Sequence, residues 1–289
     1  MSGVIDFRAR PNTPEWARYL ARRTRTIRTE AGGMKYGEYT ADEETLDGFL
    51  KQLDEAGIER AVFAARDRSG TDPDWILTND FVAECVRAAP DRIVGFAGID
   101  GSRPEAAADA VRHAVCDLGL LGACFDPFLL QAAPDDERFD VIYRACNDLG
   151  VPAVVTLGGL PGLPTPLRNS SPLAIDIVAK RFPDLVLIAS HGGWPFPLEM
   201  IAVAWRCENV YFENSFYHFA PGAEVLVEAA NTMIGHKMLY ASAYPFAPLG
   251  ETLSRFRTLP FNADVLDKVL FGNADRLLAQ IAARAADAG

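Results

Sequence analysis

Short runs of apolar and β-branched residues alternate along the chain with longer segments whose apolar positions recur at helical spacing. Runs of four to seven such residues, bounded by glycine, proline or charged positions, are typical of buried strands. Eight of them occur in order, and we predict strands at Val4–Phe7, Arg60–Ala65, Ile93–Ile99, Leu120–Phe125, Pro152–Thr156, Leu185–Ala189, Val210–Glu213 and Lys237–Ala241.

Each predicted strand is followed by a segment of helical period. Gly57 and Gly150 stop two of these segments, and Ser102 with Pro104 opens a third. We predict helices at Glu44–Ala56, Asn79–Ala88, Pro104–Cys116, Arg138–Leu149, Pro172–Arg181, Pro197–Arg206, Gly222–Asn231 and Leu249–Leu259, and a helical tail at Asp264–Leu270 and Ala274–Ala286.

Eight strand-then-helix units in about 250 residues predict an α/β protein, a single (β/α)8 TIM-type barrel with a C-terminal helical extension. An open, doubly wound sheet is the rival, because it shows the same alternation. No GxGxxG motif follows the first strand, which removes the commonest reason to prefer the dinucleotide-binding version. With no visible linker, residues 1–289 are expected to form one domain.

Composition narrows the possible partners. The chain of 289 residues has a net charge of -11, which argues against nucleic acid and anionic membrane surfaces. It has no apolar run long enough for a membrane helix and no apolar leader segment. Its five cysteines form no CxxC pair, so we expect free thiols and a cytoplasmic protein.

In such barrels the chemistry lies at the C-terminal ends of the strands and in the loops after them. Placing the predicted strands on the sequence therefore gives a short set of candidate residues. They are Arg8, Arg10, Arg66, Asp67, Asp100, Asp126, Thr156, His191, Glu213, Asn214 and Ser242–Tyr244.

Several segments at these strand ends carry a family resemblance. They are Asp54–Ile58, Asp91–Asp100, Ser190–Pro195, Asn209–Ser215, Ser242–Phe246 and Leu270–Leu277. By these segments the chain resembles the amidohydrolase superfamily, in the branch of aminocarboxymuconate-semialdehyde decarboxylase and related decarboxylases and hydrolases. The resemblance implies a decarboxylase or hydrolase, and a homodimer.

At the positions of the family's usual metal ligands, this chain carries different residues. Where family members usually carry a His-x-His pair after the first strand, this chain has Arg8 and Arg10. Thr156 and Ala243 stand where a histidine and an aspartate are usual, and only His191 is retained. Arginine stays protonated and alanine offers no donor, so we expect no metal and no other cofactor.

The two arginines suit bidentate binding of a carboxylate, and alternation would point them to the same side. Alternatively, they form ion pairs with Asp6, Glu213 or Asp126 and hold the barrel mouth together. His191 is the candidate general acid or base, with packing against Trp194 as the alternative. His218 follows the predicted seventh strand and could act together with His191 in catalysis.

The remaining candidates carry weaker signals. Glu213 and Asp126 could act as a base or neutralise the arginines. Arg66, Thr156, Trp194, Tyr217 and Tyr244 are expected to contact substrate. The arginine-rich stretch Arg18–Arg28 could form an anionic-substrate funnel or a solvated helix, and Lys35 and Tyr36 could reach the pocket from a lid.

These observations leave three functions open. The first is a metal-independent lyase, most simply a decarboxylase, acting on a small anionic organic substrate held by arginines, with His191 as general acid or base. The second is a metal-independent hydrolase of a lactone, ester or amide that uses His191 or Glu213 as base. The third is a barrel relative that binds a ligand or partner without catalysis.

Overall fold

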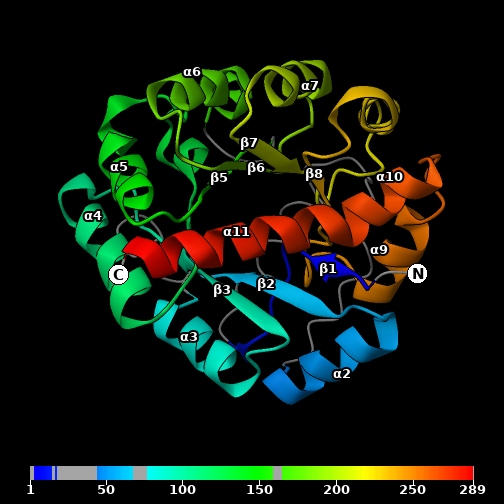
Figure 1. Cartoon of the computed structure of the whole chain (residues 1–289), viewed down its shortest axis with the longest axis horizontal. Helices are drawn as coiled ribbons and strands as arrows, with labels where there is room; N and C mark the ends of the chain where they lie inside the picture. Colours follow the sequence, from blue (N-terminus) through cyan, green and yellow to red (C-terminus); the bar gives the residue numbers. More distant parts are fainter. Residues whose placement is uncertain (1–2, 15–16, 18–43, 68–76, 159–164, 289) are drawn as a thin grey trace.

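The computed structural model describes residues 3–14, 17, 44–67, 77–158 and 165–288. Eight parallel strands form one sheet in sequence order, and the amide of Phe7 donates to the carbonyl of Tyr240 at 2.9 Å, which joins the last strand to the first (Figure 1). The strands are β1 (Ile5–Asp6), β2 (Arg60–Ala64), β3 (Ile93–Gly98), β4 (Ala123–Phe125), β5 (Ala153–Thr156), β6 (Leu187–Ser190), β7 (Val210–Glu213) and β8 (Met238–Leu239).

The helices surround this sheet as the alternation predicts, so the TIM-type barrel is confirmed (Figure 1). They are α2 (Leu46–Ala56), α3 (Asn79–Ala88), α4 (Pro104–Arg112), α5 (Asp140–Asp148), α6 (Leu173–Arg181), α7 (Pro197–Arg206), α8 (Glu224–Ala229), α9 (Leu249–Phe256), α10 (Ala263–Asp267) and α11 (Asn273–Ala288). No described helix is both long enough and apolar enough to cross a membrane.

The first and last strands are shorter than predicted, because an amide next to each strand bonds a group outside the sheet. The amide of Arg8 bonds the side chain of Asp6, and the amide of Tyr240 bonds the carbonyl of Val269. Both amides therefore leave the strand ladder. Three predicted helices also pass into π-helical turns at their C-terminal ends, at His113–Asp117, Ala230–Ile234 and Lys268–Gly272.

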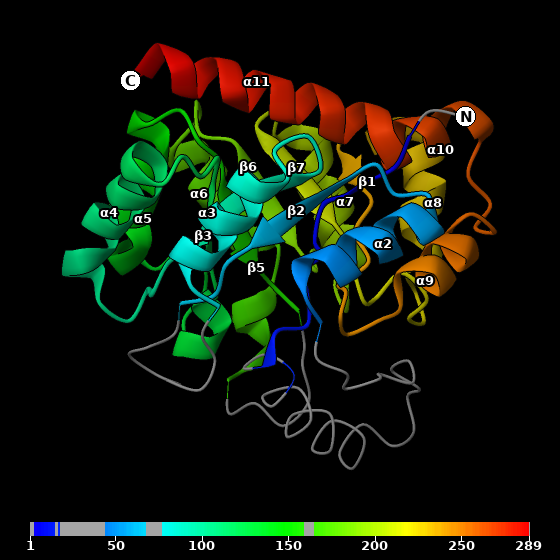
Figure 2. The ribbon, with the colours of Figure 1, turned by 90° about the horizontal axis from the view of Figure 1, so that it is seen from below.

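The core has two layers. One fills the space between strands and helices, and the other fills the barrel interior with side chains such as Ile5, Phe96 and Ile188. Leu277 and Ile281 of α11 belong to the inner layer, because α11 crosses one end of the barrel (Figure 2). That end holds the N-termini of the strands, so the opposite end is left for a site.

Truncation of Leu277 should destabilise the fold strongly. Its side chain is 0% exposed at the closed end of the barrel, so Leu277→Ala should lower the free energy of unfolding by about 2–5 kcal/mol in urea titrations. Leu198, which is 67% exposed on α7, is the matched control, and Leu198→Ala should stay within about 0.5 kcal/mol. Equal effects at both positions would contradict the assignment of α11 to the core.

Candidate active site

A cavity of about 530 Å³ opens at the C-terminal ends of the strands. Seven of the residues predicted from strand ends line it together: Arg8, Arg10, Arg66, Asp126, Thr156, His191 and Ala243. They come from the ends of β1, β2, β4, β5, β6 and β8, which shows how the barrel gathers residues far apart in sequence. Apolar side chains form the rest of the wall, including Phe128, Leu129, Phe216 and Phe246.

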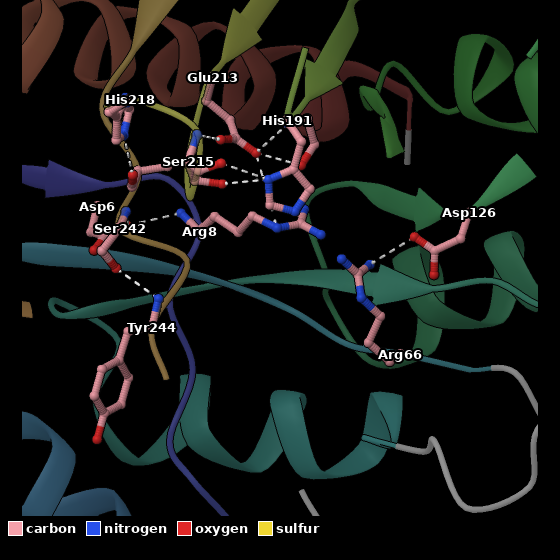
Figure 3. Close-up of polar contacts among 12 residues, drawn as sticks. Asp6, Arg8, Arg66, Asp126, His191, Glu213, Ser215, His218, Ser242 and Tyr244 are labelled. Carbon is pink, nitrogen blue, oxygen red and sulfur yellow. Dashed lines mark hydrogen bonds and ion pairs between the residues drawn. The ribbon is translucent and has the colours of Figure 1, made fainter. Parts of the chain in front are cut away.

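Two of the cavity arginines face carboxylates. Arg8 Nε lies 4.0 Å from Glu213 Oε1, and Arg66 Nη1 lies 3.9 Å from Asp126 Oδ1 (Figure 3). These distances allow charge attraction but exceed those of direct hydrogen bonds. Arg66 Nη1 and Thr156 Oγ1 are both buried and have no hydrogen-bond partner among the described residues. Buried donors in this state fit a ligand that accepts hydrogen bonds.

Arg10 adds a third guanidinium to the same wall. It is 3% exposed, and burial lowers its pKa to about 10, although Cys124, Asp126 and Glu213 act in the opposite direction. It therefore stays charged at neutral pH. Burial also opposes the charge of Arg66, yet neighbouring Asp126 leaves the pKa of Arg66 above its ordinary value.

Glu213 lies behind the cavity rather than in its wall. Its carboxylate accepts hydrogen bonds from the Ser190 hydroxyl, from the amide of His191 at 3.2 Å and from the amide of Ser215 at 2.6 Å. Its oxygens are thus engaged by the polypeptide. This geometry favours Glu213 as a positioning and charge-neutralising residue over the base that the sequence also suggested.

His191 is held by its Nδ1 atom. Nδ1 lies 2.8 Å from the carbonyl oxygen of Ser215 and 3.0 Å from the Ser215 hydroxyl. Because a carbonyl only accepts, Nδ1 carries the proton, and Nε2 is left as the basic nitrogen of the neutral ring. Burial lowers the pKa of His191, and Arg66 and Arg10 add to this effect against Glu213 and the Ser215 hydrogen bond. The ring is therefore neutral at pH 7.

Unusual backbone geometry is concentrated at this cavity. His191, Phe216 and Ala243 have φ values of 57°, 71° and 66°, in the left-handed region that non-glycine residues rarely adopt. All three line the cavity. Such conformations are maintained where the surrounding structure fixes a functional arrangement.

Trp194 and Tyr217 support His191 without lining the cavity. Trp194 stacks on Tyr217 with ring centroids 5.1 Å apart and planes at 13°. Tyr217 in turn meets the His191 ring edge to face at 5.7 Å. The expectation that His191 packs directly on Trp194 is thus replaced by a stack in which Tyr217 stands between them.

Tyr244 and His218 lie away from the arginines (Figure 3). The Tyr244 hydroxyl donates to Glu44 Oε2 at 2.9 Å, which ties the loop after β8 to the start of α2. His218 is 5% exposed, and its Nε2 lies 2.7 Å from the carbonyl of Ala241. The catalytic partnership proposed for His218 therefore has no direct geometric support. The stretch Arg18–Arg28 and the residues Lys35 and Tyr36 lie outside the described residues.

Sequence reasoning missed the apolar half of the cavity and the residue that orients His191. Phe128 and Leu129 follow β4 directly, and Phe246 closes the Ser242–Phe246 segment, so their strand-end positions were the available signal. Ser215 follows Glu213 by two residues. Nothing in its residue type indicated that its carbonyl would hold a histidine.

Glu213→Gln should disturb both the fold and His191. A glutamine places an N–H group against donors that need an acceptor and leaves Arg8 without its carboxylate. Because loss of a buried charged partner typically costs about 3–5 kcal/mol, we expect a drop of this order in the free energy of unfolding. Glu208, whose side chain is 97% exposed, gives the control Glu208→Gln. A Glu213→Gln chain as stable as the control would contradict the positioning role.

Asp6 predicts an unusual pH dependence of stability. Its side chain is 0% exposed, and burial raises its pKa from 3.8 to about 7, against hydrogen bonds from Ser242. Between these two values Asp6 binds more protons in the folded chain than in the unfolded chain, so its contribution to the free energy of unfolding should fall as pH rises from about 4 to 7, opposite in sign to that of the buried histidines. Asp6→Asn should remove this contribution in urea titrations across this pH range, whereas the exposed control Asp91→Asn should retain it.

A family model described as amidohydrolase matches residues 5–280. The chain belongs to the amidohydrolase family. An uncharacterised TIM-barrel protein of Bordetella bronchiseptica is 33% identical to this amidohydrolase, with a TM-score of 0.84 over 96% of this chain and 99% of that one.

Two further relatives are named as decarboxylases. A gamma-resorcylate decarboxylase of Polaromonas sp. is 23% identical over 80% of this chain and 86% of its own length. The crystal structure of a dihydroxybenzoic acid decarboxylase, also from Polaromonas sp., contains manganese and the inhibitor 2-nitroresorcinol. It is 20% identical, with a TM-score of 0.69 over 96% of this chain and 97% of that one, and shows the shared fold.

The residues of this amidohydrolase do not fit such a manganese site. Arg8, Arg10, Thr156 and Ala243 surround His191 in the cavity and supply two protonated guanidinium groups, one hydroxyl and a methyl group. Manganese prefers several oxygen or imidazole donors. In the described part of the chain, no three His, Cys, Asp or Glu side chains are arranged to hold a metal ion.

Proposed function

We propose that this amidohydrolase is a decarboxylase-type lyase that acts on a small carboxylate-bearing substrate without a metal. In this proposal Arg8, Arg10 and Arg66 bind the anion, and His191 transfers the proton. The observation that carries it is the convergence of three buried guanidinium groups and one neutral histidine on a single cavity. The similarity to proteins named as decarboxylases supports the reaction type.

The charges and donors of the cavity suit a carboxylate. Arg8 faces Glu213 and Arg66 faces Asp126, at 4.0 and 3.9 Å. Arg10 adds a third charged guanidinium group, and His191 is neutral. A substrate carboxylate would give the buried Arg66 Nη1 and Thr156 Oγ1 the acceptor that they lack.

The apolar wall gives the site its second property. Phe128, Leu129, Phe216 and Phe246 exclude water from the carbon skeleton of a ring or an enoic acid. A low-dielectric wall strengthens the attraction of the arginines for the anion.

Decarboxylation consumes one proton, because a carboxylate and a proton become a C–H bond and carbon dioxide. Neutral His191 can take a proton at Nε2 from a substrate hydroxyl, which leaves an oxyanion, and then deliver that proton to the carbon that bears the carboxylate. The C–C bond breaks, its electron pair returns to the carbon skeleton as carbon dioxide leaves, and the oxyanion regains a proton from solvent. The imidazole ends in its neutral state, and the sum is one solvent proton consumed and one carbon dioxide released. Glu213 and Ser215 keep Nε2 turned to the cavity throughout.

The neutral state of His191 also favours a second candidate, a hydrolase. A basic Nε2 can activate water for attack on a lactone, ester or amide, and the arginines would bind the carboxylate elsewhere in the substrate. The two reactions differ in product, since only the lyase releases carbon dioxide.

The direct test is an assay of purified protein against aromatic and enoic carboxylic acids and their lactones, with detection of carbon dioxide and of ring-opened acid. We expect stoichiometric carbon dioxide from at least one acid. Hydrolysis products without carbon dioxide would establish the hydrolase instead. Binding of the acids without turnover of any compound would identify a non-catalytic relative and overturn the proposal.

A further inference from the structure

A second cavity of about 570 Å³ adjoins the first. It lies between α9 and the loops that follow β7 and β8, and we call it the side cavity. His218, Ser242 and Thr252 form its inner polar wall, and Glu251 and Arg255 stand at its exposed rim. In Figure 3, His218 and Ser242 lie on the other side of Arg8 from Arg66 and Asp126.

Two aromatic side chains belong to the walls of both cavities. Phe216 and Phe246 line both of them, with ring centroids 6.2 Å apart and planes at 73°. Both side chains are half-buried, and each belongs to a loop rather than to a strand or helix. The two cavities therefore meet at this ring pair.

The side cavity differs in charge from the first cavity, which is lined by Arg8, Arg10 and Arg66. Its two charged residues, Glu251 and Arg255, have opposite signs, and the Arg255 guanidinium is held 3.9 Å above the Phe219 ring. Burial lowers the pKa of His218, so this ring is neutral as well. The two charges at the rim of the side cavity are therefore opposite in sign, in contrast to the three arginines of the first cavity.

His218 lines this wall and has one acceptor that no described residue uses. Its Nε2 donates to the carbonyl of Ala241, which leaves Nδ1 with a lone pair. Nδ1 is buried and has no hydrogen-bond partner among the described residues. The Thr252 side chain, which is 7% exposed, adds a hydroxyl to the same wall. A ligand group with an O–H or N–H donor would satisfy this histidine.

We propose that the side cavity is a subsite for an uncharged, hydrogen-bonding arm of the same substrate. This inference rests on the proposed function. The carboxylate of the substrate binds the arginines, and a hydroxyl or amide arm passes Phe216 and Phe246 to reach His218 and Thr252.

The test measures affinities by calorimetry for three ligands: benzoate, benzoate with a para hydroxypropyl arm, and benzoate with an isosteric para butyl arm. We expect the hydroxypropyl ligand to bind about tenfold more tightly than the butyl ligand. Ala247 lines only the side cavity, so Ala247→Phe should abolish this preference and leave benzoate affinity unchanged. Thr252→Val, which keeps the volume and removes the hydroxyl, should reduce the preference severalfold.

The control variant is Ala282→Phe, at an exposed alanine of α11, which should retain wild-type affinities. Equal binding of the two arms to wild type, or a preference that survives Ala247→Phe, would overturn the side-cavity proposal while benzoate binding through Arg10 still stands. Failure of benzoate to bind wild type would instead overturn the anion site, and with it the proposed function.

Discussion

His191→Gln is expected to lower kcat by about 10²–10⁴-fold and to change KM only a few-fold. The glutamine keeps polar atoms in the cavity but cannot accept a proton and return it to carbon. Because the arginines are untouched, binding of the carboxylate should persist. The readout is steady-state kinetics on the acid that releases carbon dioxide, with His113→Gln as the control, since His113 is exposed and pairs with Asp117.

The pH profile gives His191 a second, independent test. Burial and the nearby arginines lower its pKa below 6.5, and the reaction needs the neutral ring. The ratio kcat/KM should therefore fall as pH decreases through that lowered pKa, and this acid limb should vanish in His191→Gln. Unchanged kcat in the variant, or an acid limb that the variant keeps, would contradict the assignment of the proton transfer to His191.

Arg10→Gln is expected to raise KM by about 10–100-fold, because charge-assisted hydrogen bonds contribute about 1.5–3 kcal/mol. Arg10→Lys restores the charge without the planar fork and should recover only part of this loss. Arg112→Gln is the control, since Arg112 is exposed and pairs with Asp109 on α4.

The alternative for Arg10 is a purely structural ion pair at the barrel mouth. In that case Arg10→Gln would lower the free energy of unfolding and leave KM unchanged. Measuring urea unfolding beside the kinetics separates the two. A KM that stays at the wild-type value while stability falls would contradict the anion anchor.

The barrel could be predicted from sequence because each strand is a short buried run and each helix has a regular apolar face. Alternation also predicted that Arg8 and Arg10 reach one side, and both line the cavity. The ends of β1 and β8 could not be predicted. The amide of Arg8 bonds the side chain of Asp6, and the amide of Tyr240 bonds the carbonyl of Val269, which is distant in sequence.

The site was predictable only as far as strand ends specify it. Strand order placed His191 and Arg66 at the same mouth, but loop conformation decided where Tyr244, Trp194 and His218 point. Tyr244 turns to Glu44 because that carboxylate offers an acceptor, and no local pattern indicates a partner 200 residues away. Likewise, the role of Glu213 depends on the donors that the fold brings around it.

We propose that fixed guanidinium charge replaces a metal ion in the active site of this amidohydrolase. The most direct measurement is metal content by mass spectrometry, together with carbon dioxide release before and after treatment with a chelator. We expect far less than one metal ion per chain and turnover that chelation leaves unchanged. One manganese or zinc ion per chain, removed by the chelator together with the activity, would contradict it.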